Sequence, residues 1–277
     1  MKGLNLLYEE GLRVLNIQQL SKTFYPNTVN EKKIFQGLDL TIEEGEFVTV
    51  IGSNGAGKST LLNLISGTLT PDAGVISLLN HEITQLKEYQ RTRFISRVFQ
   101  DPTLGTSPSL TIQQNLSLAR NKGKRFGLSF LESRKDIETF KAIVAPLQLG
   151  LENQLQTPVG LLSGGQRQAL SLIMATLVKP DLLLLDEHTA ALDPKTSAKI
   201  MDLTNQMVQE SKITTLMITH NLTHAIKYGS RLIMLHEGQI VLDISGHEKQ
   251  ELTPEKLLHQ FEKNVHNGSL SDELLFS

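Results

Sequence analysis

The sequence contains no cysteine and no tryptophan among its 277 residues, and it has no long hydrophobic run. The absence of cysteine excludes a disulfide framework, thiolate metal sites and a cysteine nucleophile, and it suits a reducing cytosol. The nearest candidate for a membrane span, residues 182–185, ends at two carboxylates and is far shorter than a bilayer requires. The apolar residues 4–7 are followed at once by two glutamates, which is unlike a secretory signal. We therefore expect that any membrane part belongs to another chain.

A strong charge of one sign is also lacking. The formal net charge is -2, so no global basic field favours nucleic acid as a partner. The hydrophobic fraction of 39% is sufficient for a sizeable core. We predict an N-terminal extension at residues 1–12, one main domain at 13–245, a helical subdomain within it at about 101–178, and a C-terminal helix and tail at 246–277.

A glycine-rich loop at residues 51–60 lies between an apolar strand pattern and an apolar helix pattern, and it fits G-x-x-x-x-G-K-[ST]. Backbone N–H groups of such a loop surround a phosphate, and the helix that follows directs its positive dipole end at the same anion. Lys58 is placed to reach the terminal phosphates and Ser59 to ligate Mg²⁺. The alternative is a glycine-rich turn that binds nothing. The nucleotide-binding candidates here are Gly52, Ser53, Asn54, Gly55, Ala56, Gly57, Lys58, Ser59 and Thr60.

Two adjacent carboxylates, Asp186 and Glu187, follow the apolar residues 182–185. Ligands bind at the carboxyl ends of strands in open α/β sheets. Neighbouring residues of a strand point in different directions, so the two carboxylates should have different roles. We predict that Asp186 binds Mg²⁺ through water and that Glu187 polarises an attacking water. An acidic helix cap after a core strand is the alternative interpretation.

A second helix start with two glycines occurs at residues 162–166, Leu-Ser-Gly-Gly-Gln. Ser163 is a strong N-cap type, and Gly164 and Gly165 leave backbone N–H groups open to an anion. This pattern predicts a second phosphate site, which would serve the nucleotide of another chain. A capped core helix without a ligand is the alternative.

The rest of the chain alternates strand and helix patterns, which is typical of a parallel sheet after an initial pair of strands. The basic link at 122–125 is most simply a solvated loop. Strands are predicted at residues 13–19, 33–43, 47–51, 75–79, 96–99, 181–186, 213–219, 231–235 and 239–243. Helices are predicted at about 86–94, 112–119, 130–147, 167–178, 194–210, 221–228 and 254–261, and the polar tail at 266–272 should be mobile.

These motifs, in this order, resemble those of the ATP-binding subunits of ABC transporters over essentially all of residues 13–245. The resemblance implies an α/β P-loop NTPase with a RecA-like core, an N-terminal antiparallel β subdomain and an inserted helical subdomain. The matching segments are residues 52–60 for the Walker A motif, Gln100 for the Q-loop, 162–166 for the signature motif, 183–187 for Walker B, 191–193 for the D-loop and His220 for the switch histidine.

The resemblance implies a head-to-tail dimer, in which ATP on the Walker A motif of one subunit is covered by the signature motif of the other. Ser163, Gly164, Gly165, Gln166 and, from the D-loop, Asp193 would then contact the nucleotide.

It also implies roles for single residues around ATP and Mg²⁺. Glu187 would be the general base, His220 would hold the γ-phosphate, and Gln100 would link the metal to the helical subdomain. Phe24 fits the spacing of the aromatic residue that stacks on adenine, and Tyr25 is adjacent to it. A structural role for Phe24 beneath the strand turn is the alternative.

Residue 188 is usually proline in this family, whereas here it is histidine. We expect no chemistry from His188 and a looser turn, because the change frees one backbone N–H. Residues 186–193 resemble a bacterial subgroup whose ATPases work with permeases of the branched-chain amino-acid or ribose type and with lipoprotein substrate-binding proteins. This implies an importer of a small solute such as an amino acid, with the ATPase peripheral at the cytoplasmic face of the cell membrane.

Other functions of the same site remain open from the sequence. Energy-coupling importers of vitamins or metals also carry Phe-Gln-x-Pro, as residues 99–102 do, and an exporter is a further alternative. ABC ATPases that act on ribosomes or DNA carry two cassettes or long coiled coils, whereas this chain has one cassette and no sustained heptads. A small-molecule kinase with a P-loop would leave the signature motif and His220 unexplained.

Overall fold

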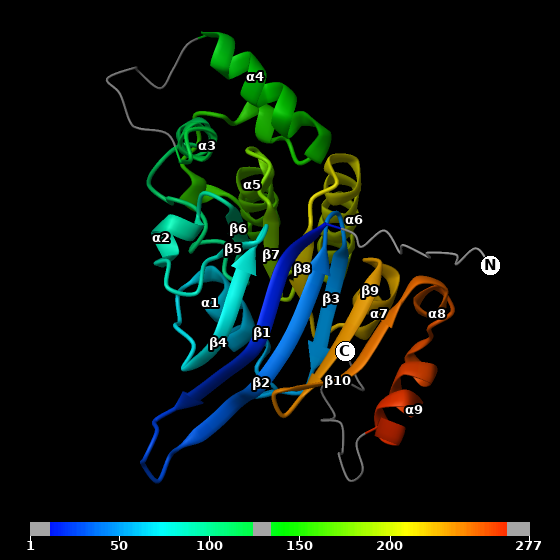
Figure 1. Ribbon diagram of the computed structural model, residues 1–277. Coiled ribbons are helices and arrows are strands. Elements are labelled where there is room, and N and C mark those ends of the chain that lie inside the picture. Colours follow the sequence, from blue (N-terminus) through cyan, green and yellow to red (C-terminus); the bar gives the residue numbers. More distant parts are fainter. Residues whose placement is uncertain (1–11, 124–133, 265–277) are drawn as a thin grey trace, which may run out of the picture.

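The computed structural model describes residues 12–123 and 134–264, which form two β-sheets with helices around them (Figure 1). Several predictions lie wholly or partly outside these residues: the N-terminal extension at 1–12, the end of the basic link at 124–125, the start of the helix at 130–147 and the polar tail at 266–272.

The first sheet is antiparallel and contains the initial pair of strands that the sequence predicted. β1 and β2 form a long hairpin in which Ile17 pairs with Leu40, so apolar side chains of both strands face the same core. The strand order is β2-β1-β4-β5. Its strands are β1 (Arg13–Phe24), β2 (Lys32–Glu43), β4 (Ala73–Leu78) and the short β5 (His81–Glu82), which the sequence did not predict.

The second sheet has six strands in the order β10-β9-β3-β8-β7-β6. All pairs are parallel except β9 with β10, so the predicted parallel arrangement is wrong for this last strand. Glu237 and Gly238 both have positive φ, and they form a two-residue connection that reverses the chain. The strands are β3 (Phe47–Gly52), β6 (Ile95–Val98), β7 (Leu182–Asp186), β8 (Thr215–Ile218), β9 (Arg231–His236) and β10 (Gln239–Ser245).

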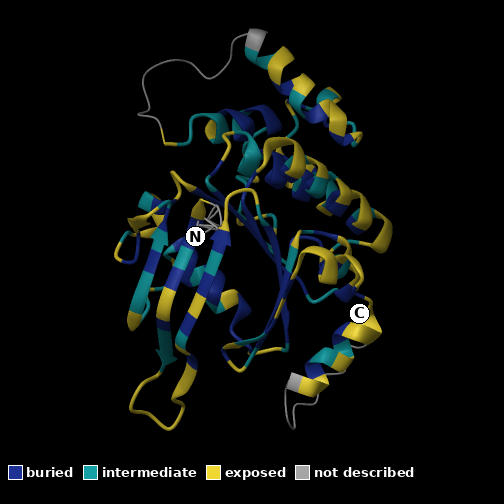
Figure 2. Ribbon diagram, turned by 45° about the vertical axis from the view of Figure 1, so that its right-hand side comes forward, coloured by how far each residue is buried: buried dark blue, intermediate teal, exposed yellow. Residues whose placement is uncertain are grey.

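Alternate side chains of the six-stranded sheet enter different cores, as the two-residue period of a strand requires. On β7, Leu182 and Leu184 pack toward the first sheet and α1, whereas Leu183 and Leu185 pack against α5 and α6. The sheet is therefore buried on both faces (Figure 2), and this explains why its strands are continuous apolar runs.

The helices agree with the predicted ones except at two places. The helix expected at 86–94 is a single turn, α2, and α8 was not predicted. The α-helices are α1 (Lys58–Ser66), α2 (Glu88–Arg91), α3 (Ile112–Arg120), α4 (Arg134–Val144), α5 (Gly164–Thr176), α6 (Pro194–Ser211), α7 (Leu222–Lys227), α8 (Gly246–Gln250) and α9 (Pro254–Asn264). Three 3₁₀ turns lie at Ala145–Leu147, Leu151–Asn153 and Val159–Leu161.

α3, α4 and α5 gather at one end of the molecule around a core of their own (Figure 1). At another side, α9 packs on β9 and β10 through Leu257 and Phe261, and Leu252 from the link between α8 and α9 joins the same core. Residues up to 264 are thus part of the main body of the protein. No helix in the described ranges has the length and apolar composition needed to cross a bilayer.

Candidate active site

The glycine-rich loop connects β3 to α1, as predicted. Gly57 is the N-cap of α1 and has a φ of 104°, a left-handed conformation that favours glycine. A Cβ atom at Gly57 would lie 2.8 Å from the Phe35 ring. The buried Lys58 extends back over the loop, because its Nζ donates to the carbonyl oxygens of Gly52 at 2.5 Å and Ser53 at 3.1 Å. The loop therefore places an ammonium group and a helix N-terminus together, as binding of a phosphate requires.

A cavity of about 410 Å³ lies over this loop. Phe24 and Tyr25 both line it, with ring centroids 6.5 Å apart, so the structure brings both predicted aromatic residues to the candidate nucleotide site. Sequence analysis did not find Asn30 and Lys32, which reach the cavity only because the β1–β2 hairpin folds over the loop. Six of the nine predicted loop residues line the cavity: Asn54, Gly55, Gly57, Lys58, Ser59 and Thr60.

Glu187 lies between two cavities. It lines the 410 Å³ cavity and also a neighbouring one of about 220 Å³, which His220 lines as well. Its Oε2 atom is 3.2 Å from Nδ1 of His220. The backbone of Glu187 is left-handed, with a φ of 44°, which is uncommon for a residue with a side chain. Its N–H donates to the carbonyl oxygen of Ile218 on β8 at 3.0 Å, so the adjacent strand fixes this conformation.

Asp186 forms an ion pair that the sequence analysis did not predict. Its Oδ2 accepts a hydrogen bond from Nη2 of Arg97 on β6 at 2.5 Å, and Nη1 of Arg97 donates to Oδ1 of Asn63 on α1 at 2.7 Å. The signal in the sequence is a single charged residue, Arg97, in the mostly apolar stretch before Gln100. Pairing across β6 and β7 cannot be deduced from that signal alone.

Ser59 lines the cavity over the loop and Asp186 is the neighbour of Glu187 in the sequence, and both carry oxygen atoms, the donors that Mg²⁺ prefers over softer ligands. Among the residues that the structure describes, no group of three or more His, Cys, Asp or Glu could hold a metal ion. Mg²⁺ is usually bound by one or two protein oxygens together with phosphates and water. The hydroxyl of Ser59 and the carboxylate of Asp186 fit that pattern.

Gln100 and the signature motif lie apart from these two cavities. Gln100 is exposed two residues after the end of β6, and it lines neither cavity. Ser163 is the N-cap of α5, as predicted, and forms a capping box: the Gln166 N–H donates to Ser163 Oγ at 3.3 Å, and the Ser163 N–H donates to Gln166 Oε1 at 3.0 Å. Asp193 caps α6 by accepting from Thr196 N–H at 3.1 Å. Residues 163–166 and Asp193 also line neither cavity of their own chain.

His188 is buried rather than part of either cavity. Its Nε2 is 3.1 Å from Thr204 Oγ1, and that hydroxyl donates to the Ile200 carbonyl at 2.8 Å. The hydroxyl must then accept from His188, so Nε2 carries the proton. Burial, together with the charge of His224, lowers the pKa of His188 to about 3. The side chain is thus neutral, and it ties the turn to α6 where we expected a looser turn.

Comparison with known proteins identifies the family. The family model described as "ABC transporter" matches residues 35–190, more than half of the chain. This chain belongs to the ABC transporter family. It is an ATP-binding subunit, and its activity is ATP hydrolysis coupled to transport.

Three similar proteins cover between 73% and 91% of this chain. A tyrosine transport ATP-binding protein of Clostridioides difficile (strain R20291) is 54% identical over 253 residues, which are 91% of this chain and 100% of the relative. A thiamine import ATP-binding protein of Escherichia coli (strain K12) is 34% identical over 73% of this chain and 82% of its own length. A solved dimeric ABC cassette bound to ADP and Pi covers 83% of this chain and 98% of its own, with 28% identity and a TM-score of 0.71.

Proposed function

We propose that this chain powers the import of an amino acid, with tyrosine as the first candidate. The chain matches the whole length of a tyrosine transport ATP-binding protein at 54% identity. One observation supports the proposed ATPase mechanism. Glu187 lines both the cavity over the phosphate loop and the cavity that His220 lines.

At Glu187 the chemistry is an attack of water on the γ-phosphorus of ATP, which breaks the bond to the β,γ-bridging oxygen and releases ADP and phosphate. Glu187 accepts a hydrogen bond from the attacking water and orients it, and His220 contacts the γ-phosphate. Ser59, Asp186 and Gln100 are the proposed Mg²⁺ partners; Mg²⁺ would supply neutralisation of charge on the phosphates. Lys58 contributes a positive charge from the protein itself. Phe24 or Tyr25 stacks on the adenine ring.

A head-to-tail dimer completes the site. Residues 163–166 line neither of the two cavities of their own chain, yet Ser163 and Gly164 begin α5, a helix of 13 residues. The N-terminus of such a helix attracts an anion. In the proposed dimer, these residues cover the ATP of the other subunit. The solved cassette bound to ADP and Pi is dimeric, which supports this arrangement.

The membrane part belongs to partner chains. ABC cassettes pair with membrane permease subunits, and we place this chain at the cytoplasmic face of the membrane, with the permease beside Gln100 and the helical subdomain. A lipoprotein on the outside would deliver the amino acid to the permease. We propose no nucleic-acid partner, because the formal net charge of -2 offers no general attraction to phosphate backbones.

One variant tests the proposed catalytic role. Glu187→Gln should bind ATP as wild type does, because the amide keeps the shape of the side chain. Its ATP turnover should fall by about 100-fold or more, since the general base is lost. Glu44→Gln, at an exposed turn, is the matched control and should turn over ATP normally. Full turnover by Glu187→Gln would contradict the assignment.

The same variant tests the partners and cargo. Tagged Glu187→Gln protein, purified with ATP from detergent-solubilised membranes of its own source, should bring down a permease and a lipoprotein. That lipoprotein should bind tyrosine in calorimetry more tightly than thiamine or a metal ion. Recovery of ribosomes or DNA would contradict transport, whereas a lipoprotein specific for a vitamin or metal would contradict only the cargo.

A further inference from the structure

Arg97 holds the carboxylate of Asp186 in a largely desolvated ion pair. The two side chains are only 12% and 15% exposed, so solvent and salt screen the pair weakly. The guanidinium carbon also lies 4.7 Å from the centroid of the Phe99 ring, and Asn63 accepts its second hydrogen bond. Arg97 therefore fixes the direction in which Asp186 presents its oxygen atoms.

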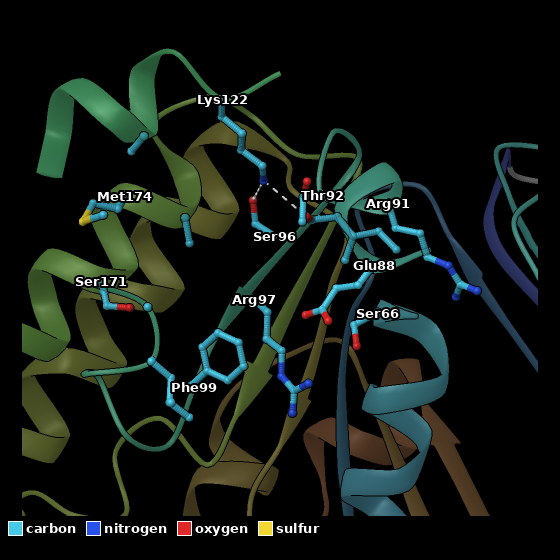
Figure 3. A pocket seen from close by; sticks show the side chains of 15 residues that line it. Ser66, Glu88, Arg91, Thr92, Ser96, Arg97, Phe99, Lys122, Ser171 and Met174 are labelled. Carbon is cyan, nitrogen blue, oxygen red and sulfur yellow. Dashed lines mark hydrogen bonds between the residues drawn. The ribbon is translucent and has the colours of Figure 1, made fainter. Parts of the chain in front are cut away.

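The Arg97 side chain also lines a cavity that Asp186 does not line. This cavity of about 350 Å³ lies between α2, β6, α3 and α5, and Arg97, Glu88 and Lys122 line it (Figure 3). Nε of Arg97 is buried and has no hydrogen-bond partner among the residues that the structure describes. A buried donor without a partner is costly. The guanidinium thus has an unsatisfied donor where it lies, and it has room and a carboxylate in the cavity beside it.

We propose that Arg97 is a positioning residue that holds Asp186 before Mg²⁺ binds and moves toward this cavity when Asp186 takes the metal. The inference rests on the proposed placement of Mg²⁺ at Asp186. A divalent ion at this carboxylate would lie near the guanidinium, and the two positive charges repel. Arg97 also occupies a lone pair of Oδ2 that the metal or its water would use.

Competition for one carboxylate has two consequences for nucleotide binding. When metal is present, Arg97 must be displaced, so its presence weakens the binding of metal and nucleotide together. When metal is absent, Arg97 neutralises Asp186 beside the phosphates, so its presence favours nucleotide. Removal of the guanidinium should therefore increase the dependence of nucleotide affinity on metal. A residue that merely supported the fold would not change this dependence.

The test compares ADP affinity with and without metal. A fluorescent ADP analogue displaced by ADP gives the dissociation constants in Mn²⁺ and in EDTA, with ADP chosen because hydrolysis does not intervene. Because the chain has no tryptophan, its four tyrosines contribute most of its intrinsic emission. For Arg97→Met, the ratio of the EDTA constant to the Mn²⁺ constant should exceed that of wild type by about tenfold, the size expected for one charge-assisted hydrogen bond. If Arg97→Met fails to fold, the same measurement is made on Arg97→Gln.

Two control variants show whether the charge of Arg97 causes the change in this ratio. Arg97→Lys keeps the positive charge and should return the ratio most of the way to the wild-type value. Lys122→Met removes another cation of the same cavity, one whose Nζ donates to Ser96 Oγ at 2.8 Å instead of to Asp186, and it should leave the ratio unchanged.

A double-mutant comparison separates this inference from the function on which it rests. In an Asp186→Asn background, Arg97→Met should have no effect on the ratio. If Asp186→Asn alone keeps the wild-type ratio, the placement of Mg²⁺ at Asp186 is wrong. If Asp186→Asn lowers the ratio but Arg97→Met leaves it unchanged or lower, the inference about Arg97 is wrong while the metal site stands.

Discussion

His188 should make the folded protein sensitive to mild acid. Its side chain is 2% exposed, and burial lowers its pKa to about 3, assisted by the charge of His224. In the unfolded chain the same ring binds a proton at its ordinary pKa of about 6.5. Between these two values the unfolded state binds more protons than the folded state, so the free energy of unfolding falls as the pH falls.

The size of the effect follows from the two pKa values. Between pH 7 and pH 5 the unfolded ring changes from mostly neutral to almost fully protonated, while the folded ring stays neutral. Proton linkage at this one residue then lowers the free energy of unfolding by about 2 kcal/mol. The loss continues to about pH 3, where the folded ring also takes up its proton. Against a typical domain stability of about 5–15 kcal/mol, this change is readily measured.

The assay is urea unfolding of wild type and His188→Asn at pH 7 and pH 5. Asparagine keeps a hydrogen-bonding group but does not titrate, so the wild type should lose about 2 kcal/mol more than the variant between the two pH values. Thr204→Val is the control: it removes the hydrogen-bond partner of the ring, so it should lower stability at both pH values while keeping the pH difference. An equal pH difference in wild type and His188→Asn would refute the reasoning.

Three other changes address stability and nucleotide binding. Arg91, almost fully buried, donates to four backbone carbonyl groups, so Arg91→Met should lower the free energy of unfolding by about 3–5 kcal/mol; a loss below about 1 kcal/mol in urea unfolding would contradict this. Phe24→Ala should weaken ATP binding by about 1–3 kcal/mol if its ring stacks on the base, whereas an effect seen only in Tyr25→Ala would move the stacking role to the exposed neighbour. Ser163→Ala should cost about 1 kcal/mol in thermal unfolding through loss of the α5 cap, and Ser163→Asn should restore it.

The sequence was sufficient to predict helices and strands that have a clear hydrophobic pattern or a clear boundary residue. Each of the residues 182–185 is apolar, and the structure buries all four on the two faces of β7. It was insufficient where tertiary packing decides the length of a helix, as at α2. There the helix ends at Arg91, whose guanidinium bonds carbonyls of α1 and of the segment before α2, a constraint that no local pattern contains.

The same distinction applies to the site. That Lys58, Ser59 and Glu187 lie together could be predicted because each belongs to a contiguous motif, and all three line the same cavity, whereas their chemical roles stay predictions. Lys32 and Arg97 could not, because each reaches the site from a different strand and has no neighbouring residue in the sequence that signals its role. Their positions depend on how the hairpin folds over the loop and on which strands are adjacent in the sheet.

The end of β7 shows how three consecutive residues acquire three different environments. Asp186 completes the strand and pairs with Arg97, Glu187 turns into a left-handed conformation toward His220, and His188 enters the core against α6. A left-handed conformation at a residue with a side chain costs about 1–3 kcal/mol and persists only where its surroundings impose it. Here the hydrogen bond from the Glu187 N–H to a carbonyl oxygen of β8 holds it, between the ion pair of Asp186 and the buried hydrogen bond of His188. The histidine that replaces the family's usual proline therefore stabilises the same turn by a buried contact, where proline would do so by restricting φ.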